Sequence, residues 1–277
     1  MADPRAPLEL SYGPHRDQRI ELFSPSTTHG HPPLALLIHG GYWRDRYGAD
    51  LMHPMARDLA SRGWKVANIE YRRLGESLTS GWPEIFEDID SAAEAVAEME
   101  LNLGTEETPV TRRVVVIGHS AGGQLALYLA RRGSVGHRFV DGVVALAPVA
   151  DLVAAAHEKL SGGAATLLMG GTPEALPERY RLCSPALFAP LGRPQLLVHG
   201  TADVNVPISQ TLSYRRVARD GGDRVELITD APLTGPAADT EDGASGVRLT
   251  SLPFDHFDVI DPGAEVWEPI RDWLQNG

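Results

Sequence analysis

The sequence predicts an α/β protein built on a mostly parallel central sheet with helices on both faces, and three observations lead to that fold class. Strand-like and helix-like segments alternate along the 277 residues, which indicates βαβ units. Several of the strand-like segments are near-continuous apolar runs, such as Leu34–His39, and this is typical of strands buried on both faces. The run Val114–Ile117 leads through a glycine-rich turn into a helical pattern at Gln124–Arg132.

The first expected element is a hairpin of Leu8–Tyr12 and Arg19–Phe23, joined by a Gly-Pro turn. A helix is expected over Ala49–Arg62, because Gly63 provides its end. A long helix is expected over Trp82–Leu101, where apolar residues recur at helical spacing and acids occupy the other face. The remaining elements are expected to be the strands Val66–Tyr71, Val140–Ala147 and Gln195–His199 and the helices Pro207–Asp220 and Gly263–Gln275.

We expect a single domain over residues 1–277, within which two segments interrupt the alternation. Asp151–Pro190 is too long for a plain crossover, so we expect a small cap over the site. Thr229–Gly246, rich in Ala, Gly, Pro, Thr and Asp, is expected to be a mobile loop. It separates Val225–Ile228 from Val247–Leu252. Either run fits the last strand of the sheet, and a hairpin of the two is the third possibility.

The composition excludes several classes of partner. A formal net charge of -12 argues against nucleic acid, because little is available to neutralise a phosphate backbone. One cysteine allows no intramolecular disulfide, the N-terminus shows no signal-peptide pattern, and no apolar run approaches the ~20 residues that span a bilayer. We therefore expect a cytoplasmic protein that acts on a small molecule, without a membrane partner. A homodimer is expected only because it is the commonest assembly.

The segment Gly118-His119-Ser120-Ala121-Gly122 carries the strongest chemical signal. A strand, a tight turn with serine at its apex and a helix form the context of the G-x-S-x-G nucleophile elbow, in which the serine attacks a carbonyl. The alternative is a glycine-rich turn that binds a phosphate, but neither phosphate-binding glycine motif is present here. Ser120 is therefore the expected nucleophile.

Hydrolases with this elbow place the acid and then the base after the serine in chain order. Asp203 directly follows the expected strand Gln195–His199, whereas Asp223 and Asp230 are rival acids near the end of the next strand. Of the ten histidines only His256 lies beyond Asp203. The predicted catalytic residues are thus Ser120, Asp203 and His256, with the histidine as base and the aspartate orienting it.

The loop His39-Gly40-Gly41-Tyr42-Trp43 follows an apolar strand and resembles an oxyanion loop of the HGG type. We expect backbone N–H groups of Gly41 and Ala121 to hold the oxyanion, with the N–H of Tyr42 as the alternative to Gly41. We expect His39 to brace the loop rather than take part in the chemistry.

Two other sets of residues have the side chains of a metal site or of a substrate-binding site. A metal site at His29-x-His31 is disfavoured because no other ligand type stands at suitable spacing, so neither a metal nor a cofactor is expected. Arg72 and Arg73 follow a strand and suit a substrate carboxylate, but ion pairs with Glu84, Glu87 and Asp88 are the expected arrangement.

Taken together, the elbow, the HGG loop, the HGTAD segment and the late histidine resemble the α/β-hydrolase superfamily across nearly the whole chain. Within it, the HGGYW and DHFDVI segments resemble those of the kynurenine formamidases (arylformamidases). That resemblance implies a Ser-Asp-His hydrolase that cleaves N-formyl-L-kynurenine in tryptophan breakdown, whereas the Thr229–Gly246 insertion departs from the family's compact pattern.

A carboxylesterase acting on small-acyl or aryl esters is the alternative function, and a non-catalytic receptor on the same scaffold is a third. Tyr42 and Trp43 are the candidate substrate-binding residues. For Trp43, stacking on an aromatic substrate and packing beneath the loop are equally compatible with the sequence.

Overall fold

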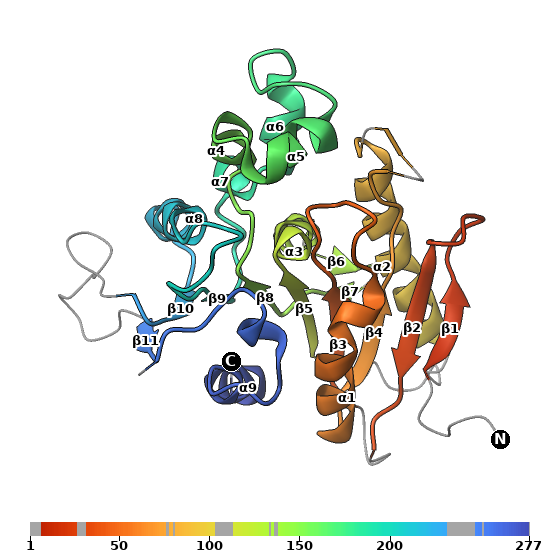
Figure 1. Cartoon of the computed structure of the whole chain (residues 1–277). Helices are drawn as coiled ribbons and strands as arrows, with labels where there is room; N and C mark the ends of the chain where they lie inside the picture. Colours follow the sequence, from red (N-terminus) through yellow and green to blue (C-terminus); the bar gives the residue numbers. More distant parts are fainter. Residues whose placement is uncertain are drawn as a thin grey trace.

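The computed structural model describes residues 7–26, 32–75, 78–79, 81–102, 113–132, 134–135, 138–231, 247–250 and 252–276. Within these residues the chain forms a nine-stranded sheet in the order β1-β2-β4-β3-β5-β8-β9-β10-β11 (Figure 1). β1 and β2 pair antiparallel as the expected opening hairpin, and β2 also pairs antiparallel with β4. Every other neighbouring pair is parallel, which confirms the predicted mostly parallel sheet.

The strands are short, and those in the middle of the sheet are buried along their whole length. They are β1 (Leu8–Ser11), β2 (Arg19–Phe23), β3 (Leu34–Ile38), β4 (Lys65–Ile69), β5 (Val114–His119), β8 (Gly142–Leu146), β9 (Gln195–Val198), β10 (Val225–Thr229) and β11 (Val247–Leu249). A separate small hairpin consists of β6 (Ser134–Val135) and β7 (Arg138–Phe139).

Helices cover both faces of the sheet, as predicted. One buried cluster joins the sheet to α2 (Glu84–Asn102), α3 (Ala121–Arg131) and α8 (Ser209–Asp220). The cluster on the opposite face joins it to α1 (His53–Ser61) and α9 (Trp267–Asn276). Two short 3-10 helices are η1 (Ala49–Met52) and η3 (Asp258–Ile260). No helix in the described part of the chain is both long and apolar enough to cross a membrane.

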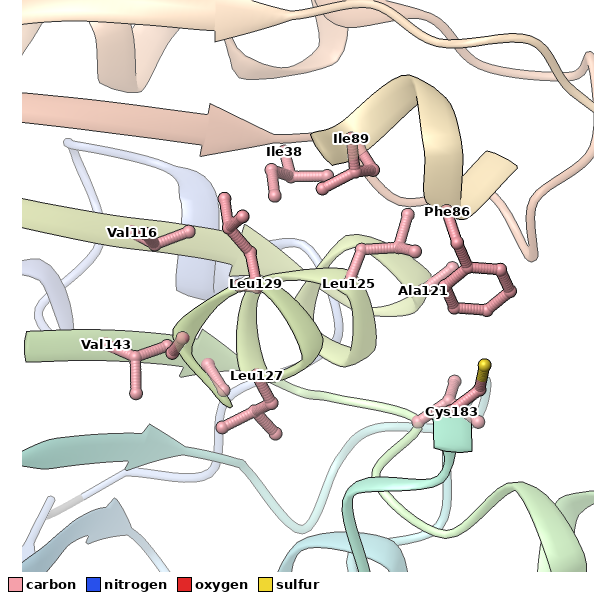
Figure 2. Close-up of a cluster of buried hydrophobic side chains, with 14 of the residues drawn as sticks. Ile38, Phe86, Ile89, Val116, Ala121, Leu125, Leu127, Leu129, Val143 and Cys183 are labelled. Atoms are coloured by element: carbon pink, nitrogen blue, oxygen red, sulfur yellow. The ribbon is translucent and has the colours of Figure 1, made fainter. Parts of the chain in front are cut away.

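Helix α3, which follows the elbow, is the central helix of its layer. Figure 2 shows Leu125 and Leu129 of this helix on the side of Ile38 and Val116, and Leu127 on the opposite side of the helix. All five of these side chains are at most 1% exposed. Because burial of each such side chain contributes roughly 1.5–3 kcal/mol, this packing anchors the helix whose first residue follows Ser120.

Most differences from the predicted boundaries have local causes. The helix expected over Ala49–Arg62 begins as the 3-10 turn η1 and becomes α-helical with Pro54 in its first turn. Proline suits that position because it has no N–H to leave unpaired. The closing helix begins at Trp267 rather than Gly263, after a turn in which Asp261 accepts from the N–H of Gly263.

The end of the sheet settles a question that the sequence left open. Both candidate runs belong to the sheet, because β10 pairs in parallel with β9 and β11 pairs in parallel with β10. A parallel pair needs a crossover connection, so the hairpin alternative is wrong and β11 is the last strand. Residues 232–246 of the expected loop lie outside the described residues.

The segment Asp151–Pro190 folds mainly into four helices between β8 and β9, which stand together at the top of Figure 1. They are α4 (Leu152–His157), α5 (Leu160–Met169), α6 (Pro177–Cys183) and α7 (Pro185–Phe188). Asp151 caps α4 by accepting from the N–H groups of Val153 and Ala154. The predicted role of this segment as a cap remains a prediction, as does the single-domain organisation.

Candidate active site

Ser120 lies at the turn between β5 and α3 in a backbone conformation that side chains rarely adopt, with φ 56° and ψ -119°. Its neighbours must be glycines because the chain passes too close to itself for a Cβ atom. A Cβ on Gly118 would lie 2.0 Å from the carbonyl oxygen of Gly122, and one on Gly122 would lie 2.1 Å from that of Ile38. The turn therefore has the geometry expected of a nucleophile elbow.

The side chain of Ser120 opens into a cavity of about 250 Å³ rather than bonding to the protein. The residue is only 1% exposed, yet its Oγ has no hydrogen-bond partner in the described part of the chain. His256 lines the same cavity and is 5% exposed. The serine and histidine thus share one cavity without a hydrogen bond between them, and such bonds often tighten only when substrate binds.

Asp203 holds His256 directly, with 2.6 Å between Oδ2 of the aspartate and Nδ1 of the histidine. The other carboxylate oxygen accepts from the N–H groups of Asn205 and Val206. Because a carboxylate only accepts, Nδ1 carries the proton and Nε2 is left free to take one. Burial raises the pKa of Asp203, but hydrogen bonds from His199 and His256 outweigh it and hold the pKa well below its ordinary value.

The two rival acids are engaged elsewhere. Asp223 accepts from the N–H groups of Leu191 and Gly192 and from the side chain of Gln195, and so organises the turn before β9. Asp230 bonds to the N–H and the hydroxyl of Thr201. Only Asp203, of the three, lies against His256.

Two histidines that the sequence reasoning did not assign belong to this network. His199 is fully buried, and its Nε2 lies 3.2 Å from Oδ2 of Asp203. His119 lies 2.8 Å, through Nε2, from the carbonyl oxygen of His256. Burial and the neighbouring His256 lower the pKa of His119 to about 3, so its ring is neutral and donates this bond. His199 is the first residue of the HGTAD segment and His119 directly precedes the elbow serine, and these two positions were the available signals in the sequence.

The HGG loop lies directly against the elbow. A Cβ on Gly40 would be 2.9 Å from both Nδ1 of His119 and Cβ of Ser120. Gly41 has φ +119°, a conformation that favours glycine. No hydrogen bond among the described residues uses the N–H of Gly41, Tyr42 or Ala121. All three candidate oxyanion donors are therefore available to a ligand.

A buried ion-pair network braces this loop through His39, in agreement with the role expected for it. Nδ1 of His39 donates to the carbonyl oxygen of Gly40 at 2.8 Å, and Nε2 lies 2.9 Å from Oε1 of Glu70. Glu70 also accepts from the N–H groups of Ala49 and Tyr71. Burial raises the pKa of Glu70, but the interactions with His39 and Arg73 outweigh it and lower the pKa to about 2.

Trp43 does not serve as a stacking surface, so the prediction that it binds substrate is wrong. It is fully buried and donates from Nε1 to Oε1 of Gln124 at 3.1 Å, which makes it part of the core beneath the loop. Tyr42 does line the cavity, and its hydroxyl donates to the carbonyl oxygen of Asn205.

The arginine pair after β4 forms ion pairs within the protein. Arg72 binds Asp88 of α2 with contacts of 2.7 to 3.1 Å, as expected. Arg73 pairs instead with Asp17 and Glu70. His29 and His31, the disfavoured metal ligands, lie outside the described residues.

The cavity combines the reacting residues with side chains from the loop after Gly41. It is lined by Gly41, Tyr42, Arg44, Arg46, Tyr47, Leu51, His119, Ser120, Ser161, Asn205, His256 and Phe257. Arg44, Arg46, Tyr47 and Phe257 were not assigned from the sequence, because only the folded structure shows that they line this cavity.

Comparisons with known proteins agree with this architecture. The family model BD-FAE matches residues 20–216. A curated relative, the probable isoprenylcysteine alpha-carbonyl methylesterase of Oryza sativa subsp. japonica, is 27% identical over 78% of this chain. The chain spans about half of that relative's length, 55%.

Solved structures share the fold at low sequence identity. A truncated carbohydrate esterase from gut microbiota has a TM-score of 0.73 and 17% identity, covering 99% of this chain and 97% of that one. Esterase B from Lactobacillus rhamnosis has a TM-score of 0.70 and 22% identity, covering 99% and 87%. The overall architecture is therefore the α/β-hydrolase fold.

Proposed function

The chain belongs to the BD-FAE family, and from this membership and the geometry of the cavity we propose that the protein is a serine esterase acting on small-acyl carboxylic esters. The 2.6 Å bond between Asp203 and His256, with His256 beside Ser120 in one cavity, is the observation that carries the proposal. The curated relative is described as a methylesterase and two solved relatives as esterases, which supports ester chemistry.

In the proposed reaction, Nε2 of His256 takes the proton of Ser120 while the serine oxygen attacks the ester carbonyl. The N–H groups of Gly41 and Ala121 donate to the oxygen as it becomes negative, and the N–H of Tyr42 is the alternative to Gly41. His256 then protonates the departing alcohol. Water, activated by the same histidine, releases the acid from Ser120. Asp203 stays ionised throughout and stabilises the protonated imidazole.

The preference for a small acyl group follows from the space available. A cavity of about 250 Å³ has the volume of about eight liquid water molecules, which is below the usual range for drug-sized ligands. Helices α4–α7 contribute Ser161 to its wall, and we propose that they act as the cap that limits its size.

Cleavage of N-formyl-L-kynurenine is the second candidate function. The formyl group is the smallest acyl group, and the rings of Tyr47 and Phe257, with centroids 6.2 Å apart, provide aromatic contacts for an aryl amide. Trp43, one of the HGGYW residues that carry the formamidase resemblance, offers no support because it is buried.

Turnover of an aryl acetate and of N-formyl-L-kynurenine by the same preparation discriminates between the two candidates. We expect efficient hydrolysis of the acetate and a much lower kcat/KM for the formamide, and the reverse order would replace the first candidate by the second. Ser120→Ala is expected to lower kcat by a factor on the order of 10⁶. The thermal unfolding of this variant should be unchanged, since Oγ makes no hydrogen bond in the described structure. Activity that survives the substitution refutes both candidates.

A further inference from the structure

We propose that Arg44 and Arg46 form an anion-recognition subsite, so that the preferred ester carries a carboxylate on its leaving group. This inference rests on the proposed esterase function, because a small acyl group leaves room for the carboxylate only on the departing alcohol or phenol. The subsite defines the class of ester on which the proposed esterase acts.

The first observation is the charge of the cavity wall. Arg44 and Arg46 line it together with Ser120 and His256, and its described lining contains no aspartate or glutamate. Two unopposed cations in a partly enclosed cavity attract an anion, because the protein walls screen less than water does.

The second observation is that neither arginine is neutralised by a carboxylate in the described structure. Arg62, Arg72, Arg73, Arg132 and others form ion pairs, whereas no ion pair among the described residues involves Arg44 or Arg46. Their positive charge therefore remains available to a ligand.

The third observation is that both side chains have fixed neighbours. Nη2 of Arg44 donates to the carbonyl oxygen of Ser161 at 2.9 Å, which uses one of its five N–H donors. The guanidinium of Arg46 lies over the ring of Tyr47, 5.3 Å from its centroid. An arginine held in this way presents its planar donor pair with less loss of rotamer freedom, and that pair matches a carboxylate.

Hydrolysis of two matched substrates tests the subsite. The substrates are 4-acetoxybenzoate, which is anionic, and 4-acetoxybenzamide, which is neutral and of similar shape. The measured quantity is the ratio of their kcat/KM values, and comparing this ratio between variants cancels the different reactivities of the two phenols. The double variant Arg44→Gln/Arg46→Gln is expected to lower the ratio by about tenfold or more, since hydrogen bonds to charged groups contribute roughly 1.5–3 kcal/mol.

Arg131→Gln is the matched control. Arg131 also donates to a backbone carbonyl, that of Leu182, and also lies over an aromatic ring, that of Phe188, but it is outside the cavity. The ratio of the two kcat/KM values in Arg131→Gln should equal the ratio in the unchanged protein. In the unchanged protein the ratio should fall as salt is added, because screening weakens the attraction of exposed charges. An unchanged ratio in the double arginine variant, or an equal fall in Arg131→Gln, overturns the proposal.

A binding measurement separates failure of the subsite from failure of the esterase function. Calorimetric titration of Ser120→Ala with 4-hydroxybenzoate needs no turnover. Binding that weakens about tenfold when both arginines are replaced supports the subsite even if neither ester is hydrolysed. If both esters are hydrolysed but binding of 4-hydroxybenzoate does not depend on the arginines, the subsite is overturned and the esterase function stands. If 4-hydroxybenzoate binds to none of the variants, the subsite is overturned as well.

Discussion

Replacing Glu70 with glutamine removes the central charge of the network that braces the oxyanion loop. Glu70 is 2% exposed and accepts from His39, Ala49 and Tyr71. Its pKa lies at about 2 in the folded protein instead of the ordinary 4.5. That difference corresponds to about 3 kcal/mol of folding stability at neutral pH. We therefore expect Glu70→Gln to lower the free energy of unfolding at pH 7 by about 3 kcal/mol.

The sign of the pH dependence follows from the lowered pKa. The contribution of Glu70 is fully present above pH 4.5 and is lost as the pH falls toward 2, where the carboxylate takes up a proton in the folded protein as well. The difference in unfolding free energy between Glu70→Gln and the unchanged protein should thus shrink to about 1.5 kcal/mol at pH 3.

Urea unfolding followed by circular dichroism at several pH values measures this difference directly. Glu178→Gln is the control, because Glu178 forms an exposed ion pair with Arg181 and its loss should leave stability unchanged within error. A Glu70→Gln variant as stable as the unchanged protein at pH 7, or a difference that does not vary between pH 7 and pH 3, would falsify the inferred network.

Two further substitutions probe the site. Asp203→Asn should lower kcat by roughly 10⁴, measured with an aryl acetate, because the base loses its orienting acid. Asp223→Asn should lower stability and leave kcat unchanged, because Asp223 bonds to structural partners instead. Equal losses of kcat in the two variants would contradict the assignment of Asp203. Trp43→Phe should lower the free energy of unfolding by about 1–3 kcal/mol, since Oε1 of Gln124 loses its buried donor, with KM unchanged. A raised KM with full stability would instead support stacking on substrate.

The sequence by itself determined the fold class and identified the candidate catalytic residues. Alternating apolar and helical patterns are local, so the parallel sheet could be predicted from short windows. The glycine at 118 is also a local requirement, because its Cβ would clash with Gly122, whereas the glycine at 122 is required by the distant strand residue Ile38. The order of serine, acid and histidine along the chain then left His256 as the single candidate base.

Only the tertiary structure decided what surrounds these residues. Trp43 meets Gln124, 81 residues away, and this contact makes it a core residue instead of a substrate contact. The support of His119 for His256 spans 137 residues, and the bond from Arg44 to Ser161 spans 117. Whether a side chain is buried, paired or open to a cavity depends on such distant partners, which no pattern of neighbouring residues specifies. The elbow therefore predicts hydrolysis from the sequence, but what the cavity admits depends on how distant segments pack.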